Sequence, residues 1–249
     1  PFSLFREYVA QLVEYDKKFL IIGNKNAVTY KEIFSLFKEN KIRIGYRNMN
    51  SDFWLEVPEG NSFEKVENGK KVKHIMACWY TNLPTTKQEE VLVLYKKYTP
   101  EEYPKYDNYD AIDVSKVTDI PQDYNGVIGV PITFLDKHNP DQFEIVALGN
   151  SRENFTPNKD YINPKKHTKD GKTVNGGAIN CVLSLSQKEK PVGKVYYTSD
   201  NSEFLVPPYA RILIKKKEVC VTAFCRRDCS HAVGGHRSSL VRFSGHARK

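Results

Sequence analysis

Residues 18–27 read KFLIIGNKNA, a short apolar run that ends at a glycine and an asparagine. Continuous runs of this length are typical of strands buried on both faces, as in a parallel sheet covered by helices. Apolar residues spaced by three and four predict an amphipathic helix over residues 4–15. A second helix around residues 33–37 and a second strand over residues 41–46 follow. This alternation predicts an α/β fold with a parallel sheet.

The pattern changes after Arg47. Four strand-like segments follow, at residues 53–57, 62–66, 72–80 and 91–98. Turn signals such as Glu67-Asn68-Gly69 separate them. The simplest interpretation is an antiparallel addition to the parallel sheet. We place the end of this first domain, residues 1–99, near Thr99.

The next region, residues 100–217, is first dense in Tyr, Asp, Asn and Pro. Short strands are expected at residues 127–130, 143–148, 181–185 and 211–215. Residues 151–180 contain Asp170-Gly171 and Gly176-Gly177, which favour loops with little regular structure. The pattern predicts a second, irregular α+β domain.

The tail, residues 218–249, differs in composition from the rest. The chain carries 27 Lys and 5 Arg up to Glu218, but 1 Lys and 5 Arg after it. We expect this segment to be disordered or read out of frame. The alternative is a zinc site, because zinc-ligand residue types gather here: Cys220, Cys225, Cys229, His231 and His236. No Cys-x-x-Cys pair occurs, which favours the expectation of no bound metal.

The chain has a formal net charge of +8 and a pI near 9.1. A basic excess attracts polyanions, so nucleic acid is a reasonable partner. A solvated, lysine-rich surface explains the charge equally well. No apolar run approaches the ~20 residues of a membrane span, and no signal peptide opens the chain, so we expect a cytoplasmic protein without a membrane partner. The five cysteines, an odd number, argue against a disulfide framework.

Several long runs carry a resemblance to a known family. They are residues 2–8 (FSLFREY), 18–27 (KFLIIGNKNA), 79–83 (WYTNL), 128–137 (IGVPITFLDK) and 209–214 (YARILI). In these runs the chain resembles the EcoRI-type adenine-specific DNA methyltransferases, over residues 1 to about 217. The first region would then be the C-terminal part of a Rossmann-like methyltransferase sheet, and the second a target-recognition domain.

The resemblance implies a catalytic role for Pro1 and Phe2. In the family an Asn-Pro precedes this Pro-Phe pair, so we expect the chain to begin inside the catalytic motif. The motif's polar side chain and proline carbonyl accept hydrogen bonds from the adenine amino group, and its aromatic ring stacks on a base flipped out of the duplex. Prolines stiffen such a turn, because each fixes φ. Without the resemblance, Pro1 and Phe2 would be an ordinary helix start with a core ring.

The family's S-adenosylmethionine loop lies upstream of the catalytic motif. Gly23-Asn24-Lys25-Asn26 follows a strand, but it lacks the glycine spacing of a cofactor loop. We therefore expect S-adenosylmethionine to be the cofactor of the intact protein, with its binding motif outside this chain. The chain would be inactive alone, and a separate N-terminal half is a possible partner.

Further site residues follow from position in the fold. Ligands of open α/β sheets bind beyond the carboxyl ends of the strands, so Asn24 and Asn26 should line the cleft near the base. Trp79 and Tyr80 are candidates for a second base contact, implied by related adenine methyltransferases. The plainer alternatives are a polar loop and core aromatic residues.

Double-stranded DNA is the expected partner. Basic residues beside turns and strands can contact phosphates, and Arg152 lies in a loop region suited to reading bases. The candidates for DNA contact are Arg43, Arg47, Lys70, Lys71, Lys73 and Arg152. A rival interpretation from another class is a non-catalytic DNA-binding module or a decayed remnant. A third is a protein-interaction domain with incidental charge.

Overall fold

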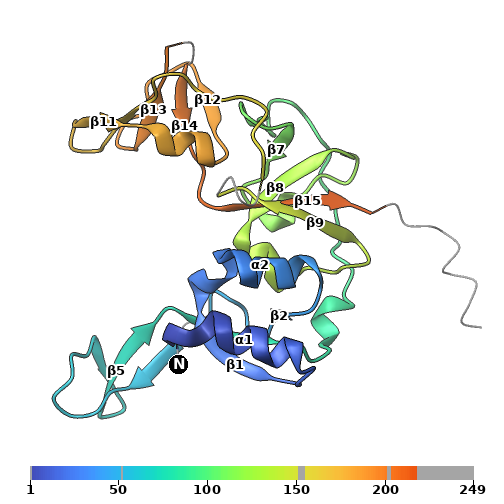
Figure 1. Ribbon diagram of the computed structural model, residues 1–249, viewed down its shortest axis with the longest axis vertical. Coiled ribbons are helices and arrows are strands. Elements are labelled where there is room, and N and C mark those ends of the chain that lie inside the picture. The colour runs from blue at the N-terminus through green and yellow to red at the C-terminus, as the bar shows by residue number, and fades with distance from the viewer. Residues whose placement is uncertain (1, 52, 151–154, 201–202, 218–249) are drawn as a thin grey trace, which may run out of the picture. The chain divides into compact units, whose positions relative to one another are not determined.

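The computed structural model describes residues 2–51, 53–150, 155–200 and 203–217, and Figure 1 shows its elements. Within these residues there are two α helices, α1 (Phe5–Glu14) and α2 (Lys31–Lys38), and four small sheets. Short 3-10 turns connect several of them: η1 (Phe2–Leu4), η2 (Lys25–Thr29), η3 (Thr86–Gln88), η4 (Val117–Asp119), η5 (Ile132–Asp136) and η6 (Gly177–Cys181). The structure is thus α/β with mainly antiparallel sheets. None of the helices in the described part of the chain is long and apolar enough to span a membrane.

The first sheet has the strand order β1 (Leu20–Asn24), β6 (Ala77–Thr81), β2 (Arg43–Ile44). Both β1 and β2 pair with β6 in antiparallel register. They therefore run in the same direction, as the α/β alternation predicts, but β6 lies between them. The expectation that β1 lies in a parallel sheet needs correction, since its neighbour among the described residues is antiparallel.

Both α helices pack on one face of this sheet. Phe5 and Val9 of α1 and Phe34 and Phe37 of α2 are buried, as their helical spacing predicts. The rings of Phe5 and Phe37 lie 4.9 Å and 6.2 Å from the ring of Tyr80 in β6. The central strand therefore anchors both helices.

Strand β1 is not buried on both faces, contrary to the sequence expectation. Leu20 and Ile22 remain 54% and 39% exposed. Side chains alternate between the faces of a strand, and the helices cover the face that Gly23 presents to Phe5. An apolar run by itself therefore did not establish burial.

The residues between β2 and β6 in the sequence form a separate three-stranded sheet, called the hairpin sheet below. It contains β3 (Phe53–Glu56), β5 (Lys70–Ile75) and β4 (Lys65–Glu67). Asn68 and Gly69 have positive φ values of 51° and 77°, as a tight two-residue hairpin turn requires. The predicted strand over residues 72–80 is divided in two at Met76.

Residues 91–98 do not form the predicted strand. The side-chain amide of Gln142 instead satisfies the backbone of Leu92, accepting from its N–H at 2.8 Å and donating to its carbonyl at 2.7 Å. A side chain fifty residues away thus takes the place of a strand partner. No local sequence pattern could predict this contact.

The next sheet has the order β7 (Ala111–Asp113), β8 (Val127–Pro131), β15 (Arg211–Lys216), β9 (Phe143–Leu148). Its β7–β8 pair is parallel and the other pairs are antiparallel. The strands expected around residues 127–130, 143–148 and 211–215 are confirmed. Because β15 lies in the middle of the sheet, the end of the described chain closes this part of the fold.

The last sheet has five strands in the order β11 (Thr173–Asn175), β10 (Lys165–His167), β13 (Tyr196–Thr198), β14 (Phe204–Val206), β12 (Leu185–Gln187). Two of them, with η6, lie in the segment that we expected to be loops. The strand expected at residues 181–185 is wrong, because η6 ends at Cys181 and β12 begins only at Leu185. Strands this short and polar have no apolar alternation to reveal them.

One hydrophobic core connects the first sheet to the β7–β8–β15–β9 sheet. It contains Phe5 and Phe37 as well as Phe143 and Ile214. The core therefore continues across Thr99, where the first domain was expected to end, and this boundary stays a prediction. The tail from residue 218, with its zinc-ligand residue types, lies outside the described residues.

A buried ion pair joins β7 to β15. Arg211 Nε donates to Asp113 Oδ1 at 2.8 Å, and the side chains are only 11% and 6% exposed. The Tyr106 hydroxyl donates to the same carboxylate oxygen. Removing one partner would leave a buried charge without compensation.

We expect Arg211→Met to lower the free energy of unfolding by about 3–5 kcal/mol. The control is Arg6→Met, which breaks an exposed 3.9 Å pair with Glu32 and should cost less than about 1 kcal/mol. Urea denaturation followed by circular dichroism measures both. Equal losses in the two variants would contradict a structural role for the buried pair.

Candidate functional site

The carboxyl end of β1 passes directly into a tightly held polar loop. Asn24 Oδ1 accepts a hydrogen bond from the backbone N–H of Asn26 at 2.8 Å and so caps η2. The backbone N–H of Lys25 donates to the carbonyl of Met76 at 3.0 Å. Asn26 is exposed, whereas Lys25 is buried. The loop thus offers an exposed amide on a fixed backbone.

The start of α1 lies beside this loop because Gly23 has no side chain, which lets the Phe5 ring pack directly against its backbone. An ideal Cβ there would lie 2.4 Å from the Phe5 ring and 2.9 Å from the Tyr80 ring. Such distances are far inside van der Waals contact, so only glycine allows this approach. Because η1 (Phe2–Leu4) leads directly into Phe5, the first described residues lie near the carboxyl end of β1.

Tyr80 holds the same loop from the other side. Its side chain is 0% exposed, and its hydroxyl donates to the carbonyl of Asn24 at 2.7 Å. Burial raises the pKa of this phenol well above its usual range. A fully buried ring cannot stack on a base, so the role that this geometry supports is to position Asn24.

Trp79 lies on the opposite face of β6. It is half-buried, and its ring lies 6.0 Å from that of Phe53. Neighbouring residues of a strand point to opposite faces, so Trp79 and Tyr80 cannot both contact one ligand. The sequence placed both residues in the right strand but could not separate their faces.

The three hairpin lysines predicted to contact DNA each contact another side chain of the protein. Lys70 pairs with Glu56 at 2.7 Å, and Lys73 Nζ donates to Ser62 Oγ at 3.1 Å. Lys71 lies over the ring of Phe63. These hairpin lysines are therefore not brought together with the loop at Asn24 by any described contact.

Two of the three arginines predicted to contact DNA lie in the described residues. Arg43 is half-buried, and burial lowers the pKa of its guanidinium. The Arg47 guanidinium lies 5.2 Å from the centroid of Phe53. Pro1, the side chain of Phe2 and Arg152 lie outside the described residues, so their assigned roles stay predictions.

The end of β1 is the one position in the sequence that was compared with a cofactor loop, and its surroundings do not fit S-adenosylmethionine. Gly23 is the glycine at the end of β1. The Phe5 ring occupies the space beside it, so no space is left there for a ligand. The following loop is closed by its own Asn24 cap. No group of three or more His, Cys, Asp or Glu in the described ranges is arranged to hold a metal ion.

Sequence reasoning missed the two residues whose packing holds the start of α1 beside the loop. Gly23 was considered only as part of a cofactor loop, and Phe5 only as a helix core residue. Their contact depends on how α1 crosses β1, and the one available signal was a glycine in an apolar strand, which often marks a close approach of other groups.

We expect Gly23→Ala to lower the free energy of unfolding by about 1–3 kcal/mol, because the new methyl group overpacks against Phe5. Gly177→Ala is the control, since its Cβ would meet only Asn175 Oδ1, at 3.3 Å. The double variant Gly23→Ala with Phe5→Leu should recover part of the stability. Thermal denaturation tests this, and a Gly23→Ala variant as stable as the control would refute the close packing.

A second expectation concerns the thiol of Cys78, which is buried in β6. Burial raises its pKa from 9.0 to about 11. The unfolded thiol ionises first, so this contribution to stability is present below pH 9 and is lost as the pH rises towards 11. At about pH 8, alkylation of Cys78 by iodoacetamide should be about a hundredfold slower in the native protein than in urea.

Peptide mass spectrometry measures this rate separately for each cysteine. Cys181, which is half-buried, serves as the internal comparison. Equal native and denatured rates at Cys78 would show that the thiol is not held in the core.

The chain matches known proteins over most of its length. A family model described as adenine-specific methyltransferase EcoRI matches residues 1–217. The Type II methyltransferase M.EcoRI of Escherichia coli is 53% identical over 156 residues, which are 59% of this chain and 48% of that protein. No solved structure matches the chain.

Two mycoplasma relatives are also similar. The Type II methyltransferase M.MgeORF184P of Mycoplasma genitalium is 38% identical over 187 residues, 71% of this chain and 59% of that protein. M.MpnI of Mycoplasma pneumoniae is 38% identical over 202 residues, 77% and 63% respectively. The chain thus spans about half to three-fifths of the length of these curated relatives. Since the family model covers residues 1–217, the chain belongs to the EcoRI adenine-specific methyltransferase family.

Proposed function

We propose that this chain carries the target-base part of a DNA adenine N6-methyltransferase from a restriction–modification system. Its substrate would be double-stranded DNA, with the adenine flipped out of the helix. One observation carries the proposal beyond family membership. The packing of Phe5 against Gly23 holds the end of η1 (Phe2–Leu4), which leads into Phe5, beside the loop of Asn24 and Asn26.

The roles of individual residues follow from this arrangement. Phe2 stacks on the adenine, and Pro1 stiffens the turn that presents its amino group. Asn26 supplies an exposed amide, which can both donate to and accept from a base edge. Asn24 and Tyr80 position this loop through the Tyr80 hydroxyl. Tyr80 makes no contact with the base, because its side chain is completely buried.

The methyl donor would be bound by residues other than those described. The Phe5 ring occupies the space beside Gly23 at the end of β1, and Asn24 caps the loop that follows, so S-adenosylmethionine does not fit at this position. We propose that the chain alone transfers no methyl group. The segment that precedes the matched region in the relatives would complete the enzyme.

Methyl transfer to DNA tests the proposal. The chain is incubated with S-adenosylmethionine and unmethylated DNA, alone and together with the preceding segment of M.EcoRI, and the nucleosides are analysed by mass spectrometry. N6-methyladenine should form only in the combined sample. Phe2→Ala should lower the rate by about a hundredfold, as expected for loss of a group that positions the reacting base.

Leu4→Ala is the matched control, because Leu4 lies in the same 3-10 turn and is 57% exposed. It should retain nearly full activity. If the combined sample bound DNA but produced no N6-methyladenine, the non-catalytic DNA-binding module would replace this proposal. Equal activity of the two variants would remove Phe2 from the mechanism.

A further inference from the structure

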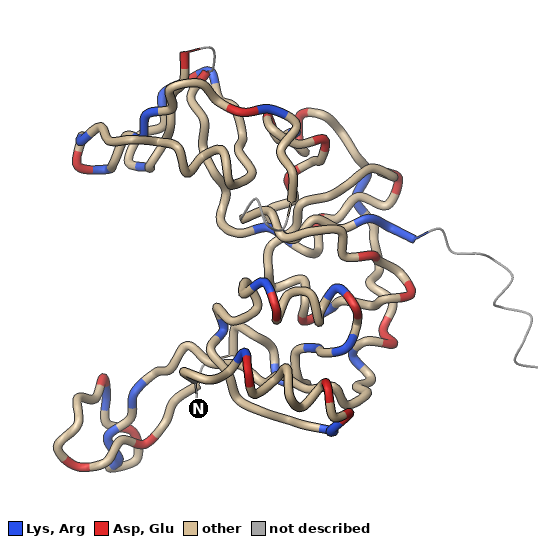
Figure 2. The backbone as a smooth tube through the Cα atoms, in the orientation of Figure 1, with Lys and Arg blue, Asp and Glu red and all other residues tan. Residues whose placement is uncertain are grey.

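The five-stranded sheet β11–β10–β13–β14–β12 and its loops carry a concentrated positive charge. Residues 163–206, which span this sheet, contain seven lysines and four acidic residues. The hairpin sheet is different, because residues 53–75 contain four lysines and four glutamates. In Figure 2 the blue parts of the backbone tube mark the basic residues on the loops of the five-stranded sheet. The charge excess of the five-stranded sheet makes it the stronger attractor for a polyanion.

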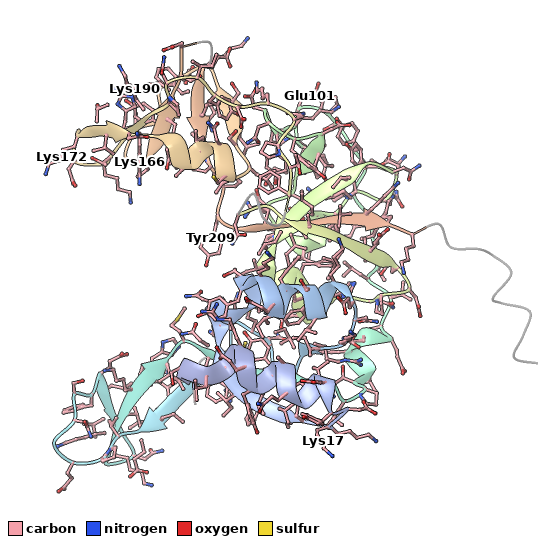
Figure 3. All side chains as sticks on the ribbon, viewed as in Figure 1. Lys17, Glu101, Lys166, Lys172, Lys190 and Tyr209 are labelled. Carbon is pink, nitrogen blue, oxygen red and sulfur yellow. The ribbon has the colours of Figure 1, made fainter. Side chains whose placement is uncertain are left out.

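A hollow of about 470 Å³ lies on this sheet. Three exposed lysines line it: Lys169, Lys190 and Lys194. Lys169 follows β10, whereas Lys190 and Lys194 come from the loop before β13, so residues distant in sequence converge there. Figure 3 shows Lys190 with Lys166 and Lys172 on the same sheet.

A rigid pair of rings forms the floor of the hollow. The His167 imidazole stacks on the Tyr196 ring at 4.6 Å, with 12° between the planes. The two imidazole nitrogens lie 3.0 Å and 3.1 Å from the hydroxyls of Thr198 and Thr173. Lys190 Nζ lies 5.8 Å above the Tyr196 ring. The contacts of the His167 and Tyr196 side chains therefore fix the floor of the hollow, and Lys190 lies over it.

The lysines of the hollow form no ion pair with any described carboxylate, whereas Lys70 and Lys65 of the hairpin pair with Glu56 and Glu67. Unpaired ammonium groups around a hollow attract anions without having to break internal pairs first. The Tyr196 ring stacks on His167, forms a T-shaped pair with Phe204 and is only 9% exposed. This leaves little open ring surface for base stacking, so the chemistry favours phosphate over bases.

We propose that this hollow binds the phosphate backbone of duplex DNA through Lys169, Lys190 and Lys194. The inference rests on the proposed function, because it takes DNA as the substrate. It adds a contact surface far along the chain from the Asn24 loop. Phosphate contacts position a duplex but do not read its sequence.

The test is duplex binding by the full chain, measured by fluorescence anisotropy between about 50 and 200 mM salt. The variant carries Lys169→Gln, Lys190→Gln and Lys194→Gln. It should bind about tenfold or more weakly and reduce the slope of log K against log salt by about 2.7, because each phosphate that a lysine neutralises adds about 0.9 to that slope. The weakening should be the same for duplexes of different sequence.

The matched control carries Lys17→Gln, Lys18→Gln and Lys38→Gln, which removes the same charge from exposed lysines. It should keep nearly the full affinity and slope. Equal weakening in both variants would overturn the proposal in favour of a general charge effect. Circular dichroism confirms that each variant is folded.

A third variant, with Lys70→Gln, Lys71→Gln and Lys73→Gln, examines the hairpin. A greater weakening there than in the hollow variant would assign the phosphate surface to the hairpin and overturn the inference. A change in sequence preference in the hollow variant would do the same, because it would indicate base reading. If the unaltered chain bound no duplex even when combined with the preceding segment of M.EcoRI, the proposed function itself would fail.

Discussion

The hydrogen bonding of β6 to both β1 and β2 is the constraint on which the candidate site depends. Because β6 is paired on both sides, its register fixes where β1 ends and where η2 begins. The Tyr80 hydroxyl and the carbonyl of Met76 then hold the backbone of Asn24 and Lys25. Ordering a polar loop costs conformational entropy, and the hydrogen bonds to β6 and Met76 offset this cost here.

Much of this arrangement could be predicted where it depends on near neighbours in sequence. The helical spacing of Phe5 and Val9 gave α1, and the apolar runs gave β1 and β9. The neighbours of each strand could not be predicted, because pairing is a long-range property. The backbone N–H of Phe19, for example, donates to Asn82 Oδ1, sixty-three residues away. The polar strand Lys165–His167 was missed because only its partners stabilise it.

The candidate site was predicted in the same uneven way. A polar loop after a strand is a local feature, so the position of Asn24 and Asn26 at the end of β1 could be predicted. The two aromatic residues of β6 were identified, but the face that each presents depends on which side the helices cover. Tyr80 became a buried support and Trp79 a half-buried neighbour of Phe53. The same alternation with the opposite phase would have exchanged their roles.

The net charge of a chain does not show which of its surfaces binds DNA. The net charge of +8 is compatible with DNA contact anywhere, but the hairpin lysines are largely offset by nearby glutamates. The loop at Asn24 offers only a buried lysine, Lys25. If this loop receives the base, it supplies little of the electrostatic affinity that holds a duplex. In the proposed arrangement that affinity comes from lysines of the five-stranded sheet that form no ion pair with a described carboxylate. Such a division leaves the base site free to be polar and shaped for one ring, while the duplex is held elsewhere.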